Sequence, residues 1–374
     1  MSTRSSIHSR PKPEIKSSQA TTAAVTAPAS ALVCPAEMSV PVRRIVTFHM
    51  NGLGDLLFTL PALHALRESF PGAAITAVVP APFLPLLQGS PLIDQLLPRP
   101  KGSVSQQVRM LKRLHDSHFD MAFAFSGTRK TALQIWATGA PVRVGYMTAK
   151  MESLLTHHVE IEGPPRIETH LELVQAAGGR PHQPDYRGLL FLGPEYSARA
   201  QALLDEHKIN GPFLIAACAA SDKRGIKEWP APHWAAAIET LSARWPVVLV
   251  GTKITPEVTQ NLTSTTQPVV DFGGRTDLPT LAALCGKAAL FCGIDSGVMH
   301  LAATMETPVV GIFGPSDWRL TGPSGVPHRI VRHPVECSPC LLSHCKWSGD
   351  DERKCLTRLA PEAVVQAVQE LIGV

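Results

Sequence analysis

A glycine-containing turn with an aspartate follows the first apolar run of the sequence. Residues 43–50 form the run, and Asn51-Gly52-Leu53-Gly54-Asp55 follows it. Ligands of open α/β sheets bind beyond the carboxyl ends of the strands, where a Gly-x-Gly turn lets the backbone approach a ligand. Asp55 at the start of the next helix is either a simple N-cap or a carboxylate that can accept a proton. The third glycine of the dinucleotide-binding fingerprint is missing.

A second turn of this kind is Gly293-Ile294-Asp295-Ser296-Gly297-Val298-Met299-His300. Ser296 and Gly297 would open a helix, whose free N–H groups and dipole favour an anion such as a diphosphate. Asp295 would repel a phosphate if it pointed at it, so we expect it to orient a cation or a hydroxyl. Val298 and His300 fall in the first turns of this helix, where a lone histidine is more often a packed residue than a ligand.

A third loop follows the apolar run at 213–220. Ser221 comes directly after the run, and Lys223-Arg224-Gly225-Ile226-Lys227-Glu228-Trp229-Pro230 follows. Taken alone, three cations in a loop are compatible with a solvated surface, but they can also neutralise phosphate charge. Because all three loops stand at expected strand ends, together they favour a nucleotide site.

Four of the eight cysteines cluster near the C-terminus, at Cys337, Cys340, Cys345 and Cys355. The leading C-x-x-C spacing is typical of a structural zinc site with four thiolates. The later spacings are irregular for common zinc modules, so paired disulfides and reduced thiols stay open as alternatives. We expect the four cysteines to lie close together, bracing a segment that is poor in apolar residues and remote from the reacting groups. Of the other four, the three in apolar surroundings are expected to be buried reduced thiols.

Apolar runs alternate with helix-period segments from residue 41 onward, which predicts an α/β protein with parallel sheets and crossover helices. The expected strands are 43–50, 74–79, 119–125, 213–220, 247–250, 269–272, 289–292 and 309–313. The expected helices include 55–70, 233–243, 278–288 and 361–372.

This alternation predicts two Rossmann-like, doubly wound domains that face each other across a cleft. The first is expected at 41–185, and the second at 186–360 with the cysteine cluster. A closing helix is expected within 361–374, and the Gly- and Pro-rich stretch 178–193 is the expected linker. Residues 1–40 are rich in Ser, Thr, Ala and Pro, which favours a disordered tail over a signal peptide.

Composition excludes several classes of protein. The 374 residues carry a formal net charge of only +4. The sequence lacks the Lys/Arg-dense stripe with aromatic residues that would predict nucleic-acid binding. It also lacks a run that approaches the ~20 apolar residues of a membrane span. The pattern is typical of a cytoplasmic protein, and a mildly basic surface is compatible with anionic substrates or an anionic membrane face.

Several of these segments resemble the motifs of glycosyltransferase family 9, the ADP-heptose:lipopolysaccharide heptosyltransferases. The segments are 45–63 with its Gly-x-Gly-Asp turn, Lys227-Glu228-Trp229-Pro230, and 295–303 followed by 308–315. The Cys337-Ser338-Pro339-Cys340 segment is similar to the tail of many members. Ser296 stands where the family usually has threonine, which keeps the hydroxyl.

The resemblance implies a B-type glycosyltransferase fold, inversion at the anomeric carbon and no required divalent metal. It makes 41–185 the acceptor domain and 186–360 the nucleotide-sugar domain. It also implies Asp55 as general base, Lys227 as phosphate ligand and Asp295-Ser296-Gly297 beside the diphosphate, with Gly52, Gly54, Ser221, Val298 and His300 near the donor. Glu257 is the expected nucleoside ligand. The expected substrates are a nucleoside-diphosphate sugar such as ADP-heptose and a glycan acceptor such as the lipopolysaccharide core, and a peripheral inner-membrane contact is compatible with them. A B-type UDP-sugar epimerase and a non-catalytic sugar-nucleotide-binding scaffold are the alternatives.

Overall fold

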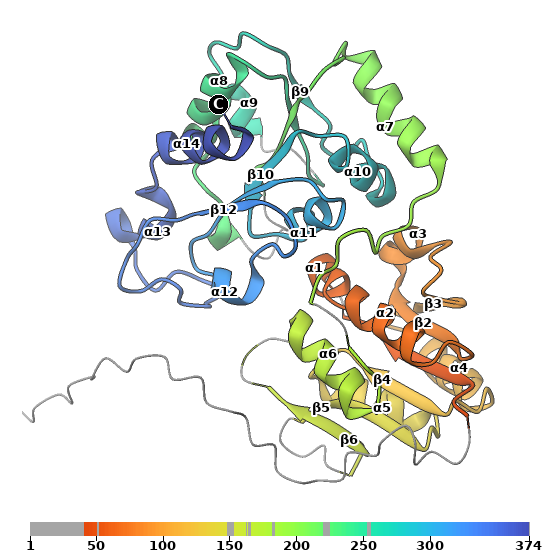
Figure 1. Ribbon diagram of the computed structural model, residues 1–374. Coiled ribbons are helices and arrows are strands. Elements are labelled where there is room, and N and C mark those ends of the chain that lie inside the picture. Colours follow the sequence, from red (N-terminus) through yellow and green to blue (C-terminus); the bar gives the residue numbers. More distant parts are fainter. Residues whose placement is uncertain are drawn as a thin grey trace, which may run out of the picture. The chain divides into compact units, whose positions relative to one another are not determined.

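The computed structural model describes residues 41–50, 52–147, 153–161, 163, 166–181, 184–219, 225–252 and 256–373 (Figure 1). The expected N-terminal tail at 1–40 lies outside the described residues. So do Ser221 and the cations Lys223 and Arg224 of the third loop.

The first half of the chain forms a six-stranded parallel sheet with the strand order β3-β2-β1-β4-β5-β6. Buried β-branched and aromatic side chains make these short runs into strands, as in β1 with Ile45, Val46 and Phe48. The strands are β1 (Arg44–Phe48), β2 (Ala74–Pro80), β3 (Gln95–Arg99), β4 (Met121–Ala124), β5 (Val142–Met147) and β6 (His157–Glu160).

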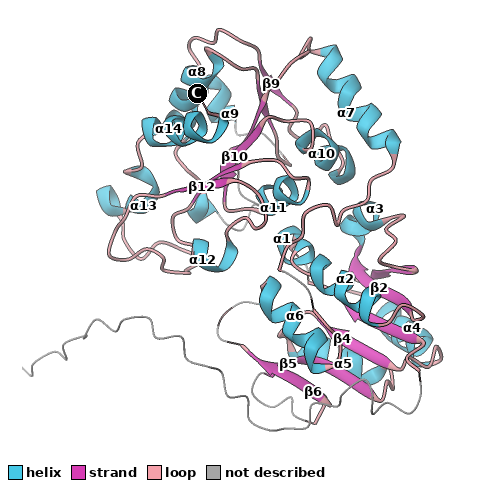
Figure 2. Cartoon of the chain, viewed as in Figure 1, coloured by secondary structure: helices cyan, strands magenta, loops and turns pink. Residues whose placement is uncertain are grey.

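Helices cover both faces of this sheet (Figure 2). On one face α2 (Leu60–Ser69) packs against α6 (Ile167–Ala176), and on the other α4 (Val104–His115) packs against α5 (Arg129–Ala137). Two short helices, α1 (Leu53–Leu57) and α3 (Leu84–Leu87), and the 3₁₀ turn Ala81–Phe83 complete this half. The buried faces of the strands alternate between the two layers, as the two-residue period of a strand requires.

The second half forms another six-stranded parallel sheet, ordered β12-β11-β10-β7-β8-β9. Its strands are β7 (Leu214–Ala217), β8 (Val247–Leu249), β9 (Val269–Asp271), β10 (Leu290–Ile294), β11 (Val309–Ile312) and β12 (His328–Val331). Its helices are α7 (Pro194–Glu206), α8 (Ala231–Ser242), α9 (Pro256–Gln260), α10 (Leu278–Cys285), α11 (Gly297–Thr304), α12 (Trp318–Thr321), α13 (Lys354–Thr357) and α14 (Pro361–Ile372), with 3₁₀ turns at Gly225–Lys227 and Gly349–Asp351.

Both sheets have the doubly wound 3-2-1-4-5-6 order, counted from the first strand of each half. The expected pair of Rossmann-like units is therefore confirmed. The strand order reverses between β1 and β4 in one sheet and between β7 and β10 in the other. Ligands of such sheets bind at the carboxyl ends of the strands beside this switch. None of the helices in the described residues has the length and apolar character needed to cross a membrane.

The prediction of one continuous helix at 55–70 is wrong in one respect. The structure has two helices there, α1 and α2, separated at Phe58–Thr59. Pro61 has no N–H to donate to the carbonyl of Leu57, and its ring would collide with that carbonyl in a continuous helix. Thr59 Oγ1 instead donates to Leu56 O at 2.6 Å. Phe58 and Thr59 keep right-handed helical dihedrals, so the break interrupts the hydrogen-bond ladder between α1 and α2.

The stretch 178–193, expected to be a linker, is part of the core where the structure describes it. Tyr186 is 0% exposed and Leu190 7% exposed. Gly188 N donates to Thr304 O of α11 at 3.1 Å. Tyr186 and Leu190 thus anchor the stretch to the core, while most of its other described residues are partly or fully exposed. The C-terminal helix α14 has the expected bounds and packs on α8 and β12.

Candidate active site

Asp55 lies in the first turn of α1, directly beyond the carboxyl end of β1. Gly52 is the N-cap of this helix, so the alternative that Asp55 is only an N-cap is wrong. A methyl group on Gly52 would overlap Asp55 Oδ2, which shows that the carboxylate folds back over the helix start. Gly52 therefore supplies the space that this carboxylate occupies.

The turn after β10 has the geometry that an anion site needs. Helix α11 begins at Gly297, with Ser296 as its N-cap, and the Ser296 side chain makes no capping hydrogen bond. Ser296 Oγ is buried and has no hydrogen-bond partner among the described residues. A hydroxyl and first-turn N–H groups left without a side-chain cap suit an incoming phosphate, which the helix dipole also favours.

Asp295 and Lys227 form an ion pair between the two loops at this switch point. Both side chains are largely buried, with 6% of Asp295 and 16% of Lys227 exposed. The expectation that Asp295 orients a cation is therefore met. An ammonium carries three N–H donors, so Lys227 can hold Asp295 and still donate to a phosphate.

Two residues, Trp229 and Arg353, hold the 3₁₀ turn Gly225–Lys227 that carries Lys227. Trp229 Nε1 donates to Leu359 O at 3.0 Å, and its ring meets Trp234 edge-on with centroids 5.1 Å apart. Arg353 Nη1 donates to Gly225 O at 3.3 Å and to Glu228 O at 3.1 Å, on either side of Lys227. The lysine thus stands on a turn that is fixed from both sides.

Helices α1 and α11 pack directly on each other. A Cβ on Gly54 would lie 2.9 Å from His300 Cδ2, and a Cβ on Gly297 would lie 2.7 Å from Leu53 Cβ. Both distances are shorter than ordinary van der Waals contact, so these glycines allow the helices to approach. The contact brings the helix of Asp55 against the helix that Ser296 opens.

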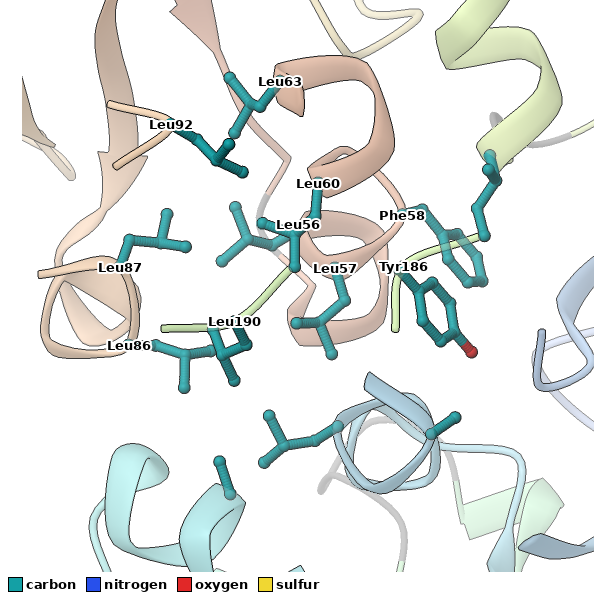
Figure 3. Close-up of a cluster of buried hydrophobic side chains, with 14 of the residues drawn as sticks. Leu56, Leu57, Phe58, Leu60, Leu63, Leu86, Leu87, Leu92, Tyr186 and Leu190 are labelled. Carbon is teal, nitrogen blue, oxygen red and sulfur yellow. The ribbon is translucent and has the colours of Figure 1, made fainter. Parts of the chain in front are cut away.

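His300 is buried in this contact, with 3% of its surface exposed. Its Nδ1 lies 3.3 Å from Tyr186 Oη, and its ring meets Phe58 edge-on with centroids 4.6 Å apart. Figure 3 shows Phe58 and Tyr186 side by side in this cluster. Burial lowers the pKa of His300 to about 4, so the ring is neutral near pH 7. His300 therefore joins α11 to the first half of the chain through packing.

A second buried histidine, which the sequence analysis did not single out, contacts the residues that flank α1. His49 follows β1, is 0% exposed, and its Nδ1 lies 2.9 Å from Thr59 Oγ1. Arg99 Nη1 donates to His49 O at 2.8 Å. Burial first, and then the nearby Arg99 charge, lower the pKa of His49 to about 3. These bonds link Thr59, which follows α1, and His49, which follows β1, to each other and to Arg99 of β3.

The remaining residues that the resemblance places near the donor have different surroundings. Glu257 is exposed in the first turn of α9, which follows β8, the neighbour of β7 in the sheet. Val298 is partly buried against the core. Ser221 lies outside the described residues.

A pocket missed by the sequence reasoning lies beside α1. It is lined by Phe58, Arg166, Glu168, Trp318, Arg319 and His328, among others. Phe58 comes three residues after Asp55 and therefore occupies nearly the same side of the helix. Trp318 is 40% exposed and presents an aromatic face, while Arg166 pairs with Glu168 and Arg319 with Asp317. Nothing in the local pattern around Trp318 could have joined it to residues 150 positions earlier.

The four C-terminal cysteines line one pocket together with Ile226, the neighbour of Lys227. The expected proximity is thus found, and the pocket is nearer the Lys227 turn than we expected. All seven described cysteines are free thiols. Arg353 N donates to Cys345 Sγ at 3.2 Å. Burial, followed by the neighbouring thiols, raises the pKa of Cys355 to about 11. No three His, Cys, Asp or Glu side chains in the described part of the chain are placed as a metal-ligand set.

Comparisons with known proteins agree with this architecture. The family model described as glycosyltransferase family 9 (heptosyltransferase) matches residues 107–349. The chain is 25% identical over 287 residues to lipopolysaccharide heptosyltransferase 3 of Escherichia coli, covering 71% of this chain and 83% of the relative.

Two solved structures show the same fold. A family 9 glycosyltransferase from Veillonella parvula DSM 2008 matches with a TM-score of 0.77 and 23% identity, over 90% of this chain and 98% of the other. An E. coli heptosyltransferase with ADP-2-deoxy-2-fluoro heptose matches with a TM-score of 0.65 and 20% identity, over 87% of this chain and 99% of the other.

Proposed function

The chain belongs to glycosyltransferase family 9, the heptosyltransferases, and from this premise we propose that it transfers heptose from ADP-heptose to a lipopolysaccharide-core acceptor. It is a glycosyltransferase with two Rossmann-like units. The observation that carries the proposal is the packing of α1, with its carboxylate, against α11, with its uncapped anion site.

The donor would bind with its diphosphate at the start of α11. Ser296 Oγ, the first N–H groups of α11 and Lys227 converge on the carboxyl ends of β7 and β10, where the switch-point rule places a nucleotide. Glu257 would contact the nucleoside from the loop after β8. The choice of ADP-heptose rests on the E. coli structure solved with a fluorinated ADP-heptose.

The reaction would be a single displacement that inverts the anomeric carbon. An acceptor hydroxyl attacks this carbon as Asp55 takes the hydroxyl proton, and the bond from the carbon to the diphosphate oxygen breaks. The leaving ADP carries the electron pair and gains negative charge, which Lys227 and the α11 N-terminus stabilise. These positive groups supply what a divalent metal supplies elsewhere, so we propose that transfer requires none.

The pocket beside Phe58 is the proposed place for the acceptor. The exposed indole ring of Trp318 offers an apolar face to a sugar ring, and the paired groups Arg166–Glu168 and Arg319–Asp317 offer polar atoms to its hydroxyls. Phe58 of this pocket lies three residues after Asp55, so an acceptor held there would need to extend along α1 to bring its hydroxyl to the base. A lipid-anchored acceptor and a nucleotide-sugar donor together would place the enzyme at the cytoplasmic face of the inner membrane.

We also propose structural zinc for the four C-terminal thiols, although the described side chains are not placed as a ligand set. Four thiolates suit zinc chemically. The hydrogen bond from Arg353 N to Cys345 Sγ is of the kind that stabilises a metal-bound thiolate. No step of transfer would pass through this metal.

A donor and acceptor screen tests the proposal. Release of nucleoside diphosphate is measured for ADP-heptose and a panel of other sugar nucleotides, with and without lipopolysaccharide-core acceptor and with and without added Mg²⁺. We expect release that depends on ADP-heptose and on the acceptor and does not depend on Mg²⁺. Isomerised donor without acceptor would instead identify the epimerase alternative, and donor binding without turnover would identify the scaffold alternative.

A further inference from the structure

Two neighbouring helices of the first half expose an unusual set of apolar side chains. In the described chain nine large apolar side chains are exposed, and four of them belong to α4 and α5. These are Val104 (73% exposed), Val108 (59%), Leu133 (43%) and Trp136 (54%). Exposed apolar side chains that gather in one place mark interaction sites more often than isolated ones do.

Cations surround these side chains. Between residues 101 and 137 the chain has six Lys or Arg and two Asp, a surplus of four that equals the net charge of the whole chain, +4. Neither α4 nor α5 contains an acidic residue. The six cations are Lys101, Arg109, Lys112, Arg113, Arg129 and Lys130.

The apolar and basic side chains face the same side of the molecule. Met110 and Leu114 of α4 and Ala132 and Ile135 of α5 share one buried cluster against the first sheet. The two helices also pack on each other, so their opposite faces point away from the sheet together. We call this the α4–α5 surface, made of the four apolar residues and the six cations.

The α4–α5 surface begins at the edge of the sheet that carries the candidate active site. Helix α4 follows the carboxyl end of β3 and α5 follows that of β4, and all strands are parallel to β1, which leads to Asp55. Arg129 and Lys130 lie in the first turn of α5, where the helix dipole disfavours cations. Helix stability therefore does not explain these two residues.

We propose that the α4–α5 surface docks on a membrane surface that carries anionic lipid headgroups. Surfaces of this kind are bound by helices with Lys and Arg around exposed Trp, Leu and Val, which enter the headgroup region while the cations meet lipid phosphates. Three of the six cations are lysines, a residue depleted in protein–protein interfaces, and this favours a lipid surface over a protein partner. Docking at this edge would hold Asp55 near a lipid-anchored acceptor.

Vesicle binding tests this proposal without donor or acceptor, so it stands or falls independently of the transfer reaction. The full chain is floated with phosphatidylcholine vesicles that contain or lack phosphatidylglycerol. We expect binding only to the anionic vesicles, weakened by salt. Replacing two cations (Lys112→Gln with Arg113→Gln) should weaken it roughly 30-fold, since each cation near such a surface contributes about fivefold.

The apolar part has its own variants and the charge change has a matched control. Leu133→Ala removes three apolar carbons and should weaken binding by up to about 60-fold if all three are buried, because each buried carbon contributes about fourfold. The control Arg199→Gln with Arg329→Gln removes the same charge from exposed positions outside the surface and should bind nearly as the wild type does. Trp136→Phe should keep binding and abolish a blue shift of tryptophan fluorescence on vesicles.

Three results would overturn the proposal. They are equal binding to neutral and anionic vesicles, an equal loss in the control and the Lys112/Arg113 variant, and no binding by the wild-type chain. A vesicle-free dimer that Leu133→Ala dissociates would assign the α4–α5 surface to a second copy of the chain instead. Melting temperatures of all variants should match the wild type, since these side chains are exposed.

Discussion

Replacing Gly54 by alanine tests whether the contact between α1 and α11 positions the carboxylate. The added Cβ would lie 2.9 Å from His300 Cδ2, whereas carbon atoms pack at about 3.5–4.0 Å. The helices must therefore separate by roughly 0.6–1 Å, because the close packing around His300 leaves its ring no space to move away. Alanine gains about 0.5–1 kcal/mol of helix propensity, but overpacking costs about 1–3 kcal/mol, so we expect a net loss of stability.

The effect on transfer should be larger than the effect on stability. A misplacement of about 1 Å can lower the rate by about 100-fold, whereas the diphosphate site on α11 and Lys227 stays intact. We expect kcat to fall by about that factor with donor affinity changed less than threefold. The measurements are acceptor-dependent nucleotide release, donor calorimetry and urea unfolding.

A control and a double variant make this prediction refutable. Gly72→Ala adds a Cβ that meets nothing within 4 Å and should change neither rate nor stability. His300→Ala removes the ring that Gly54→Ala strikes, so the double variant should lose less than the sum of the two single losses. Wild-type kcat in Gly54→Ala would refute the positioning argument. A selective loss of donor affinity would show instead that Gly54 contacts the donor.

Four further predictions follow from the described contacts. Asp55→Asn should lower kcat by about 100- to 10,000-fold with donor affinity largely kept, as expected for loss of a general base, and activity within tenfold of wild type would remove that role. Lys227→Ala should weaken donor binding and slow transfer together, by about 10- to 100-fold for a lost charged hydrogen bond, and unchanged kinetic constants would contradict phosphate binding. Burial lowers the pKa of His49 and His170 to about 3 and of His300 to about 4, so the unfolded chain binds more protons below pH 6.5. Stability should therefore fall on acidification by up to about 1.4 kcal/mol per pH unit for each histidine, and an unfolding free energy that stays level from pH 7 to pH 5 would contradict this. Elemental analysis should find one zinc that chelation removes with a lower melting temperature, whereas metal-free protein with four titrating thiols would contradict the zinc site.

The sequence determined the α/β architecture and the order of the loops that carry chemistry. Apolar runs such as 74–79 and 309–313 became strands because alternating buried faces need β-branched and apolar side chains on both layers. Loops around Asp55, Lys227 and Asp295 were recognisable because strand ends in parallel sheets open toward ligands. These signals are local, so a few neighbouring residues carried them.

Only the tertiary structure decided which of these residues meet. Lys227 and Asp295 pair across 68 positions, and Gly54 meets His300 although nothing in either segment refers to the other. The break between α1 and α2 depends on Thr59 bonding to His49 as well as on Pro61. The hydrogen bond from Arg353 to the Lys227 turn and the pocket at Trp318 also bring together residues that are far apart in the sequence. Such contacts depend on which surfaces remain to be buried once the two sheets have formed, and no periodicity along the chain records them.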